Sequence, residues 1–160
     1  MEQMEAVTWT DIVIAIAAAF TFGVLLFAAF YARHQLQSME RTRETQLLED
    51  LSRRWDEELL RESRQVAEKY EDGTKLKEAV KELSEKNDKQ YYVLLRLPDF
   101  FEELGLLVNY ECLSPQLAKD MFGTAIQYHY TRYKPTIEFL REKYKDETIY
   151  KFFKDLANKC

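Results

Sequence analysis

The chain has 160 residues, a length that suits about one domain. Its aromatic content of 14% argues against bulk disorder, and its two Cys argue against a disulfide scaffold. Residues 44 to 112 hold 18 acidic and 11 basic side chains, so the middle of the chain would repel a nucleic acid. Residues 12 to 32 carry no charge, which sets this segment apart from the rest.

The uncharged run from residue 12 to residue 32 predicts a transmembrane helix. Its twenty-one residues would span roughly 31 Å at about 1.5 Å per residue, close to the thickness of a bilayer's hydrocarbon core. A cleaved signal peptide would have a basic first segment and a shorter apolar run, whereas this chain begins with Glu2, Glu5 and Asp11 and no Lys or Arg. We therefore expect a retained single-pass anchor.

The basic residues near the span predict its orientation. Arg33, Arg41 and Arg43 follow it and nothing basic precedes it, so residues 1–11 should form a short extracytoplasmic tail and the C-terminus should be cytoplasmic. The expected location is the inner (plasma) membrane, with the lipid bilayer as a partner. The expected interfacial anchors are Trp9, Tyr31 and Arg33.

Small residues repeat every fourth position within the span. Ala15, Ala19 and Gly23 form a stripe of the kind that lets two membrane helices pack closely. Alanine is also common in any membrane span, and that ordinary explanation is the favoured one. Self-association through the stripe stays open.

A charged segment at residues 33–72 follows the anchor without an internal Gly or Pro. An apolar stripe near helical period predicts a juxtamembrane amphipathic helix of about 35 residues, ending before a left-handed Gly73. The average spacing of about 3.8 residues is too wide for a left-handed coiled coil, so the stripe should pack on the protein's own globular part. Its members are Leu47, Leu51, Trp55, Leu59, Val66 and Tyr70.

Residues 73–160 are predicted to form a helical cytoplasmic domain. A short helix at residues 76–84 is followed by an N-cap at Asn87 or Asp88, and Pro98 is expected in the first turn of a new helix that ends near Asn109 or Tyr110. The aromatic residues recur at three and four positions, which disfavours strands.

The remaining helices have clear start signals. Ser114 with Pro115 predicts a helix with a kink or break at Pro135 and an end near Tyr144, and Asp146 should cap the last helix. The predicted class is all-α: one N-terminal transmembrane helix, a long juxtamembrane helix and a C-terminal helical bundle.

The run PDFFEELGLLV at residues 98–108 resembles the signature of a widespread bacterial family of domains of unknown function, found in small and mostly single-pass membrane proteins. Further matching residues are Met121, Phe122, Gly123, Pro135, Ile137, Arg141, Thr148, Ile149, Tyr150, Phe152 and Leu156. Asp99 stands where that family often has Asn, and Tyr130 where it often has Trp. The resemblance implies a helical cytoplasmic domain behind an N-terminal anchor, and no assigned activity.

Motifs for catalysis and cofactors are sparse. His34 and His129 have no Glu three residues before them, which disfavours a di-metal site in a helical bundle. Cys112 and Cys160 lie far apart in the sequence, and Gly73-Thr74-Lys75 is too short to cradle a phosphate. We therefore expect no enzyme activity, no catalytic residue, no metal and no cofactor.

Asp99, Glu102 and Glu103 are the acidic cluster within the apolar C-terminal half. On a helix, Glu102 lies on the flank of the inner face, where a cation from a neighbouring helix would meet it. The sequence thus predicts a structural polar pair of Glu102 and Arg141 that fixes helix register. A catalytic or ligand-binding carboxylate is the disfavoured alternative.

Aromatic residues gather around His129, and a core seam explains them more simply than a cofactor or base-stacking site.

Two classes of function remain for the chain as a whole. The favoured one is a non-enzymatic membrane-anchored interaction module, an accessory or scaffolding subunit of a membrane complex. The alternative is a small regulatory or stress or phage-defence effector that senses through its cytoplasmic domain and acts by oligomerisation. A hydrolase built on Glu102 and His129 is a weaker third. The candidate partner-contact residues are Asp99, Glu103, His129 and Tyr130.

Overall fold

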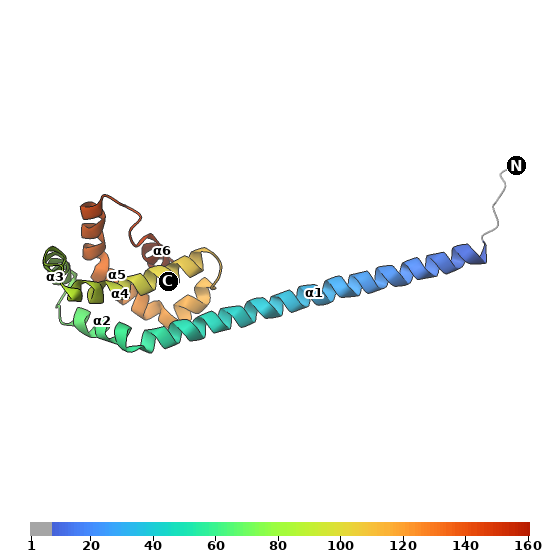
Figure 1. The fold of residues 1–160 in the computed structure, drawn as a ribbon, viewed down its shortest axis with the longest axis horizontal. Coiled ribbons are helices and arrows are strands. Elements are labelled where there is room, and N and C mark those ends of the chain that lie inside the picture. Colours follow the sequence, from blue (N-terminus) through green and yellow to red (C-terminus); the bar gives the residue numbers. More distant parts are fainter. Residues whose placement is uncertain (1–7) are drawn as a thin grey trace. The chain divides into compact units, whose positions relative to one another are not determined.

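The computed structural model describes residues 8–160, and that part of the chain is helical without a strand. The predicted all-α class is therefore confirmed. Residues 1–7, which make up most of the expected tail, lie outside the described residues. The helices are α1 (Trp9–Asp56), α2 (Glu58–Glu68), α3 (Gly73–Glu85), α4 (Lys89–Asn109), α5 (Pro115–Tyr144) and α6 (Lys151–Lys159) (Figure 1).

The chain divides into two compact units, residues 1–43 and residues 44–160. In the first unit, α1 is long and apolar enough to cross a membrane, and the apolar side chains of residues 12 to 32 are exposed. The predicted span thus lies within a continuous helix. The C-terminal end of α1, from Glu44 onward, belongs to the second unit.

The second unit contains, after the end of α1, a helix break that the sequence did not predict. Glu57 is extended, with φ −63° and ψ 149°, and it separates α1 from α2 although neither Gly nor Pro is near. Two arginines of α2 close the end of α1: Arg61 donates to the Asp56 carbonyl at 2.8 Å, and Arg64 donates to the Trp55 carbonyl at 2.6 Å. The expected single juxtamembrane helix of about 35 residues is therefore wrong at this point.

The break also changes which side of the chain is buried. Before it, Leu51 is buried and Trp55 packs on the core, as the apolar stripe predicted. After the break, the buried residues are Leu60, Ser63 and Ala67. Leu60 and Ala67 each come one position after a member of the predicted stripe, Leu59 and Val66. Leu59 is consequently 54% exposed.

Aspartates start the next two helices. Asp72 accepts hydrogen bonds from the amides of Thr74 and Lys75 at 2.8 and 2.9 Å, and Asp88 accepts one from the amide of Gln90 at 2.8 Å, as expected of N-caps. Gly73 is the first residue of α3 and is not left-handed, which corrects the expected C-terminal role. It is needed for close approach instead, because a Cβ there would lie 2.5 Å from the Arg132 carbonyl oxygen.

Pro98 lies inside α4, so the expectation of a new helix at this residue is wrong. A proline within a helix removes the amide that would bond the carbonyl four residues earlier, here that of Leu94. The Tyr133 hydroxyl donates to this carbonyl at 2.8 Å and replaces the missing amide. Pro135 likewise lies inside α5, which is assigned as one helix.

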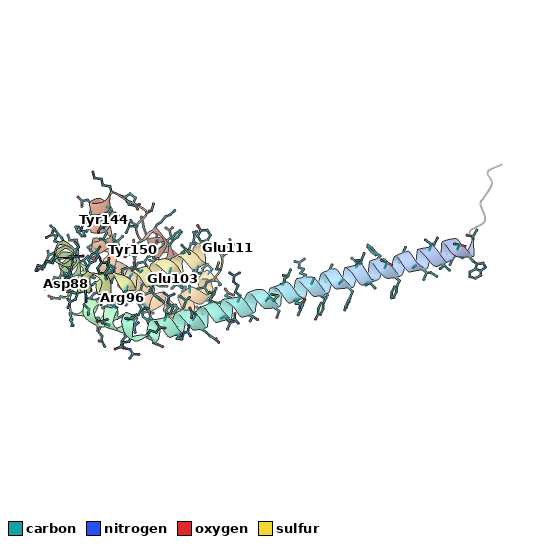
Figure 2. All side chains as sticks on the ribbon, in the orientation of Figure 1. Asp88, Arg96, Glu103, Glu111, Tyr144 and Tyr150 are labelled. Carbon is teal, nitrogen blue, oxygen red and sulfur yellow. The ribbon has the colours of Figure 1, made fainter. Side chains whose placement is uncertain are left out.

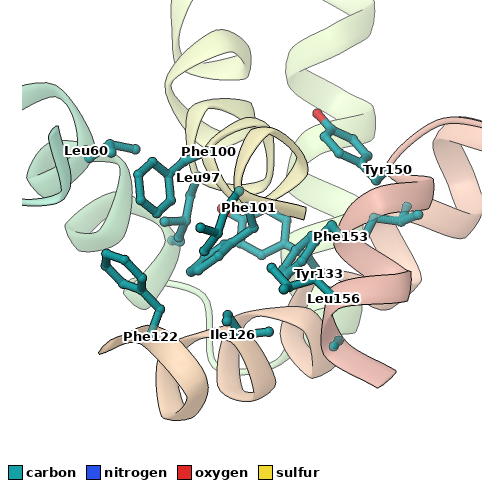
Figure 3. Close-up of a cluster of buried hydrophobic side chains, with 14 of the residues drawn as sticks. Leu60, Leu97, Phe100, Phe101, Phe122, Ile126, Tyr133, Tyr150, Phe153 and Leu156 are labelled. Atoms are coloured by element: carbon teal, nitrogen blue, oxygen red, sulfur yellow. The ribbon is translucent and has the colours of Figure 1, made fainter. Parts of the chain in front are cut away.

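α4 is the central helix of the second unit and packs against α2, α3, α5 and α6 (Figure 1). Its inner face carries Leu97, Phe101 and Leu104, which are fully buried. Figure 3 shows Phe101 and Leu97 of α4 among residues of the neighbouring helices, and the rings of Phe101 and Phe153 stack at 4.9 Å. Further labelled members of this core are Leu60, Phe100, Phe122, Ile126, Tyr133, Tyr150 and Leu156.

Candidate functional site

The acidic residues of α4 divide between two sides of the helix. Glu102 faces α6, where its two carboxylate oxygens accept hydrogen bonds from the amides of Phe152 at 3.2 Å and Phe153 at 2.7 Å. These amides belong to the first turn of α6, which has no carbonyl partners within its own helix. Glu102 therefore caps α6 from a different element, and its negative charge suits the positive end of the helix dipole.

Asp99 and Gly105 extend this contact along the same face of α4. The Asp99 carboxylate accepts a hydrogen bond from the Tyr150 hydroxyl at 2.7 Å. A Cβ at position 105 would lie 2.2 Å from the Phe152 carbonyl oxygen, so only glycine permits this approach of α6. Asp99 and Glu102, three residues apart on α4, thus hold Tyr150 and the first amides of α6.

The carboxyl groups on this face have altered proton affinities. Desolvation raises the pKa of Asp99 above its ordinary value, and the hydrogen bond from Tyr150 offsets part of the rise. Desolvation also raises the pKa of Glu102, opposed by the two α6 amides and by the positive charge of Arg141. Burial and the neighbouring Asp99 raise the pKa of Tyr150, which keeps its hydroxyl a donor.

The predicted polar pair of Glu102 and Arg141 is corrected by these contacts. Among residues 8–160 no ion pair joins the two, because Glu102 binds the α6 amides and Arg141 Nε donates to the Ile149 carbonyl at 2.8 Å. Both side chains nevertheless act near the start of α6: Arg141 binds the turn before the helix, and Glu102 binds the first amides of the helix. Asp146 accepts from the amide and hydroxyl of Thr148 and so closes the loop before α6, whose own N-cap is Tyr150.

Glu103 lies on the opposite side of α4, against the end of α1. Both its oxygens accept hydrogen bonds from the Arg54 guanidinium, at 2.6 and 2.7 Å. This contact raises the pKa of Arg54. The pair is partly exposed, so its contribution to stability is under about 1 kcal/mol.

A surface groove opens beside this pair, between α2, the end of α1 and α4. The volume of the groove is about 320 Å³. Two of the residues that line it, Arg96 and Glu103 of α4, are labelled in Figure 2. Leu60 and Phe100 contribute apolar surface, and Leu59 lies at the edge. Leu59 also borders a second depression, which runs along α2. The groove is lined by Arg54, Glu57, Leu59, Leu60, Arg96, Asp99, Phe100 and Glu103.

His129 is buried within the core and faces rings. Its imidazole lies 5.7 Å from the Phe101 ring and 6.2 Å from the Trp55 ring. Burial, reinforced by the charges of Arg64 and Arg132, lowers the pKa of His129 to about 4, so the imidazole is neutral at physiological pH. Its Nδ1 has no hydrogen-bond partner among residues 8–160. No contact in the described part of the chain joins His129 to Glu102.

The other predicted positions divide by exposure. Tyr130 is half-buried with its ring edge on Phe153 at 5.3 Å, and so it joins the core with His129. Asp99 and Glu103 line the groove, where their carboxylates already accept hydrogen bonds from Tyr150 and Arg54. In the first unit, the residues at the expected anchor and packing positions are all exposed: Trp9, Ala15, Ala19, Gly23, Tyr31 and Arg33.

Metal-binding geometry is not found among the described residues: no group of three His, Cys, Asp or Glu side chains there is placed to hold an ion. Cys112 and Cys160 are free and half-buried. Sequence reasoning missed the groove, because it treated Leu59 as part of the buried stripe. The sequence did contain a sign of the true buried face of α2, because Leu60, Ser63 and Ala67 are small or apolar residues at helical spacing.

These features define a class: an all-α bundle whose first helix is long and apolar enough to cross a membrane. The chain belongs to a family described as a domain of unknown function, DUF4760, which matches residues 13–160. The expected resemblance to an uncharacterised family is therefore confirmed. No curated protein and no solved structure matches the chain.

Proposed function

We propose that this protein is a non-enzymatic, membrane-anchored helical interaction module that serves as an accessory or scaffolding subunit of a membrane protein complex. The observation that carries the proposal is how the second unit uses its polar side chains. Glu102, Arg132 and Arg141 bind backbone groups of neighbouring elements, and His129 is enclosed by rings. Glu102 and the two arginines are thus occupied in holding helices together, and His129 is enclosed in the core.

The anchor is the second part of the proposal. Residues 12 to 32 would cross the inner (plasma) membrane once, and Arg33 and Arg43 would keep the second unit on the cytoplasmic side. The exposed apolar side chains of α1 support this assignment, because a hydrocarbon environment is where such a helix is stable.

The partner would be another protein. Residues 44 to 72 contain ten acidic and five basic side chains, which disfavours binding to a nucleic acid or to an anionic membrane surface. The groove beside Leu59 gives the same region a recess with apolar and polar lining. Both features suit a protein–protein contact.

The test is to isolate the full chain from its native membrane in mild detergent after brief chemical crosslinking, and to identify the co-purifying proteins by mass spectrometry. We expect one foreign membrane protein in near-stoichiometric amount. A control chain whose residues 12 to 32 are replaced by an unrelated apolar helix should retain the partner if the second unit binds it.

Two results would contradict the proposal. A homo-oligomer without a foreign subunit would favour the alternative, a small regulatory or defence effector that acts through oligomerisation. A turnover by the purified chain that disappears in both Glu102→Gln and His129→Ala would show an enzyme instead.

A further inference from the structure

Leu59 is the apolar residue most at odds with its surroundings on α2. It is 54% exposed, whereas its neighbour Leu60 is 8% exposed and Phe100, which lines the same groove, is 2% exposed. The side chain borders two depressions at once, one against α4 and one along α2. The break at Glu57 explains the exposure of Leu59. After the break, α2 buries Leu60 in the core instead of Leu59.

Acidic side chains surround this leucine. The two depressions are lined by five carboxylates, those of Glu57, Glu58, Glu62, Asp99 and Glu103. Three arginines also line them: Arg54, Arg61 and Arg96. The carboxylates outnumber the arginines, so the rim is negative overall.

The arginines are already engaged within the protein. Arg54 binds both oxygens of Glu103, Arg61 donates to the Asp56 carbonyl, and Arg96 lies 3.4 Å from Glu62. Glu57 and Glu58 are exposed and form no ion pair within the described part of the chain. Two uncommitted carboxylates thus stand directly beside the exposed leucine.

We propose that this groove docks a cationic amphipathic segment of a protein partner. An apolar side chain of that segment would cover Leu59 and reach Phe100, and its Lys or Arg side chains would meet Glu57 and Glu58. The inference rests on the proposed function and specifies the chemistry of the partner. Charge complementarity selects this occupant, because an anionic lipid surface or nucleic acid would be repelled by the same carboxylates.

The test places a photoreactive amino acid at Leu59 of the full chain in its native membrane. The crosslinked peptide is then sequenced by mass spectrometry. We expect a segment from another protein that carries Lys or Arg beside apolar residues at helical spacing. Leu106, an exposed leucine of α4 outside the groove, is the matched control position and should not capture that segment.

Charge reversal gives the second measurement. Glu57→Lys with Glu58→Lys should lower the crosslinking yield from a probe at Leu59 by about tenfold, because reversed charges repel the segment. Glu78→Lys with Glu85→Lys changes the net charge equally on the exposed side of α3 and should leave the yield within about twofold, since distant charges are screened.

Several outcomes would overturn the inference: no product at Leu59, an acidic or uncharged segment, a segment of a second copy of this chain, or an equal loss with the α3 control. These outcomes differ from failure of the proposed function. If a probe elsewhere on the second unit captures a foreign membrane subunit while Leu59 captures nothing, the module function stands and the groove assignment is wrong. If no position captures a foreign protein, both are wrong.

Discussion

Single charged residues of one helix close the ends of another helix. Glu44 accepts from the Ser114 amide at 2.6 Å where α5 begins, and Glu102 accepts from the first amides of α6. Arg64 and Arg132 donate to the last carbonyls of α1 and α2. In each case the sign of the charge opposes that of the helix terminus, which contributes about 0.3 to 1 kcal/mol, more where partly buried.

Asp99 gives a pH-dependent prediction. Its pKa is raised in the folded protein, so its contribution to stability is complete below the unfolded pKa of about 3.9 and is lost as the pH rises through the folded pKa. Asp99→Asn keeps an acceptor for the Tyr150 hydroxyl but cannot ionise. We expect the variant to equal or exceed the native chain in free energy of unfolding at pH 7, by under about 1 kcal/mol because the carboxyl stays partly solvated.

Denaturation of the full chain in detergent at pH 4 and pH 7, followed by circular dichroism, measures this difference. The advantage of the variant should shrink toward pH 4. The exposed control Glu147→Gln should not reproduce the effect. A variant that is less stable than the native chain at pH 7, and equally so at pH 4, would contradict the role of charge at this position.

At the scale of helices, local sequence signals predicted where helices begin better than whether a helix continues through a given residue. Asp88 and Ser114 start helices as expected, because N-cap preferences act within a few residues. Pro98 was wrongly predicted to start a helix. The Tyr133 hydroxyl compensates for the missing amide of Pro98, and this hydroxyl comes from another helix. At the Glu57 break, Arg61 and Arg64 of the next helix bind the last carbonyls of α1, and neither Gly nor Pro marks the position in the sequence.

The compensation at Pro98 can be tested by a double-mutant cycle. Tyr133→Phe alone leaves the buried Leu94 carbonyl without a donor and should cost about 1 to 3 kcal/mol of unfolding free energy. In a Pro98→Ala chain the restored amide at position 98 can bond that carbonyl, so Tyr133→Phe should then cost distinctly less. Equal costs in the two backgrounds, measured by denaturant unfolding, would mean that the hydroxyl does not replace the amide.

The close approach of α4 and α6 predicts opposite effects for two glycines within helices. Gly105→Ala would place a methyl group against the backbone of Phe152, and such overpacking should cost about 1 to 3 kcal/mol. At Gly123 the nearest atom is Cγ of the flexible Lys119 side chain at 3.3 Å. Gly123→Ala should therefore be neutral or stabilising by up to about 1 kcal/mol, since alanine favours helix. Thermal unfolding compares the pair, and a loss at Gly123 equal to that at Gly105 would contradict the α4–α6 contact.

At the scale of the whole molecule, the charge pattern changes at residue 33, whereas packing divides the chain between residues 43 and 44. The uncharged run lies in the first unit, and the acidic stretch from Glu44 to Asp72 lies in the second. The all-α class and the long apolar helix could be predicted because both follow from composition and period. The candidate groove could not, since it depends on the phase shift at Leu59 and on pairing between α1 and α4.

The placement of basic residues predicts the topology of the chain. Arg33, Arg41 and Arg43 follow the predicted span and should resist translocation, while residues 1 to 11 contain no Lys or Arg. A reporter that is active only in the cytoplasm should therefore give signal when fused after Cys160, and a reporter active only outside should be silent there. Replacing Arg33, Arg41 and Arg43 with Gln and adding three Lys before Trp9 should weaken or invert this pattern, because the charge bias is then reversed. Signal from the outside reporter on the native sequence would contradict the predicted orientation. It would mean that the groove beside Leu59 faces the outside of the cell instead of the cytoplasm.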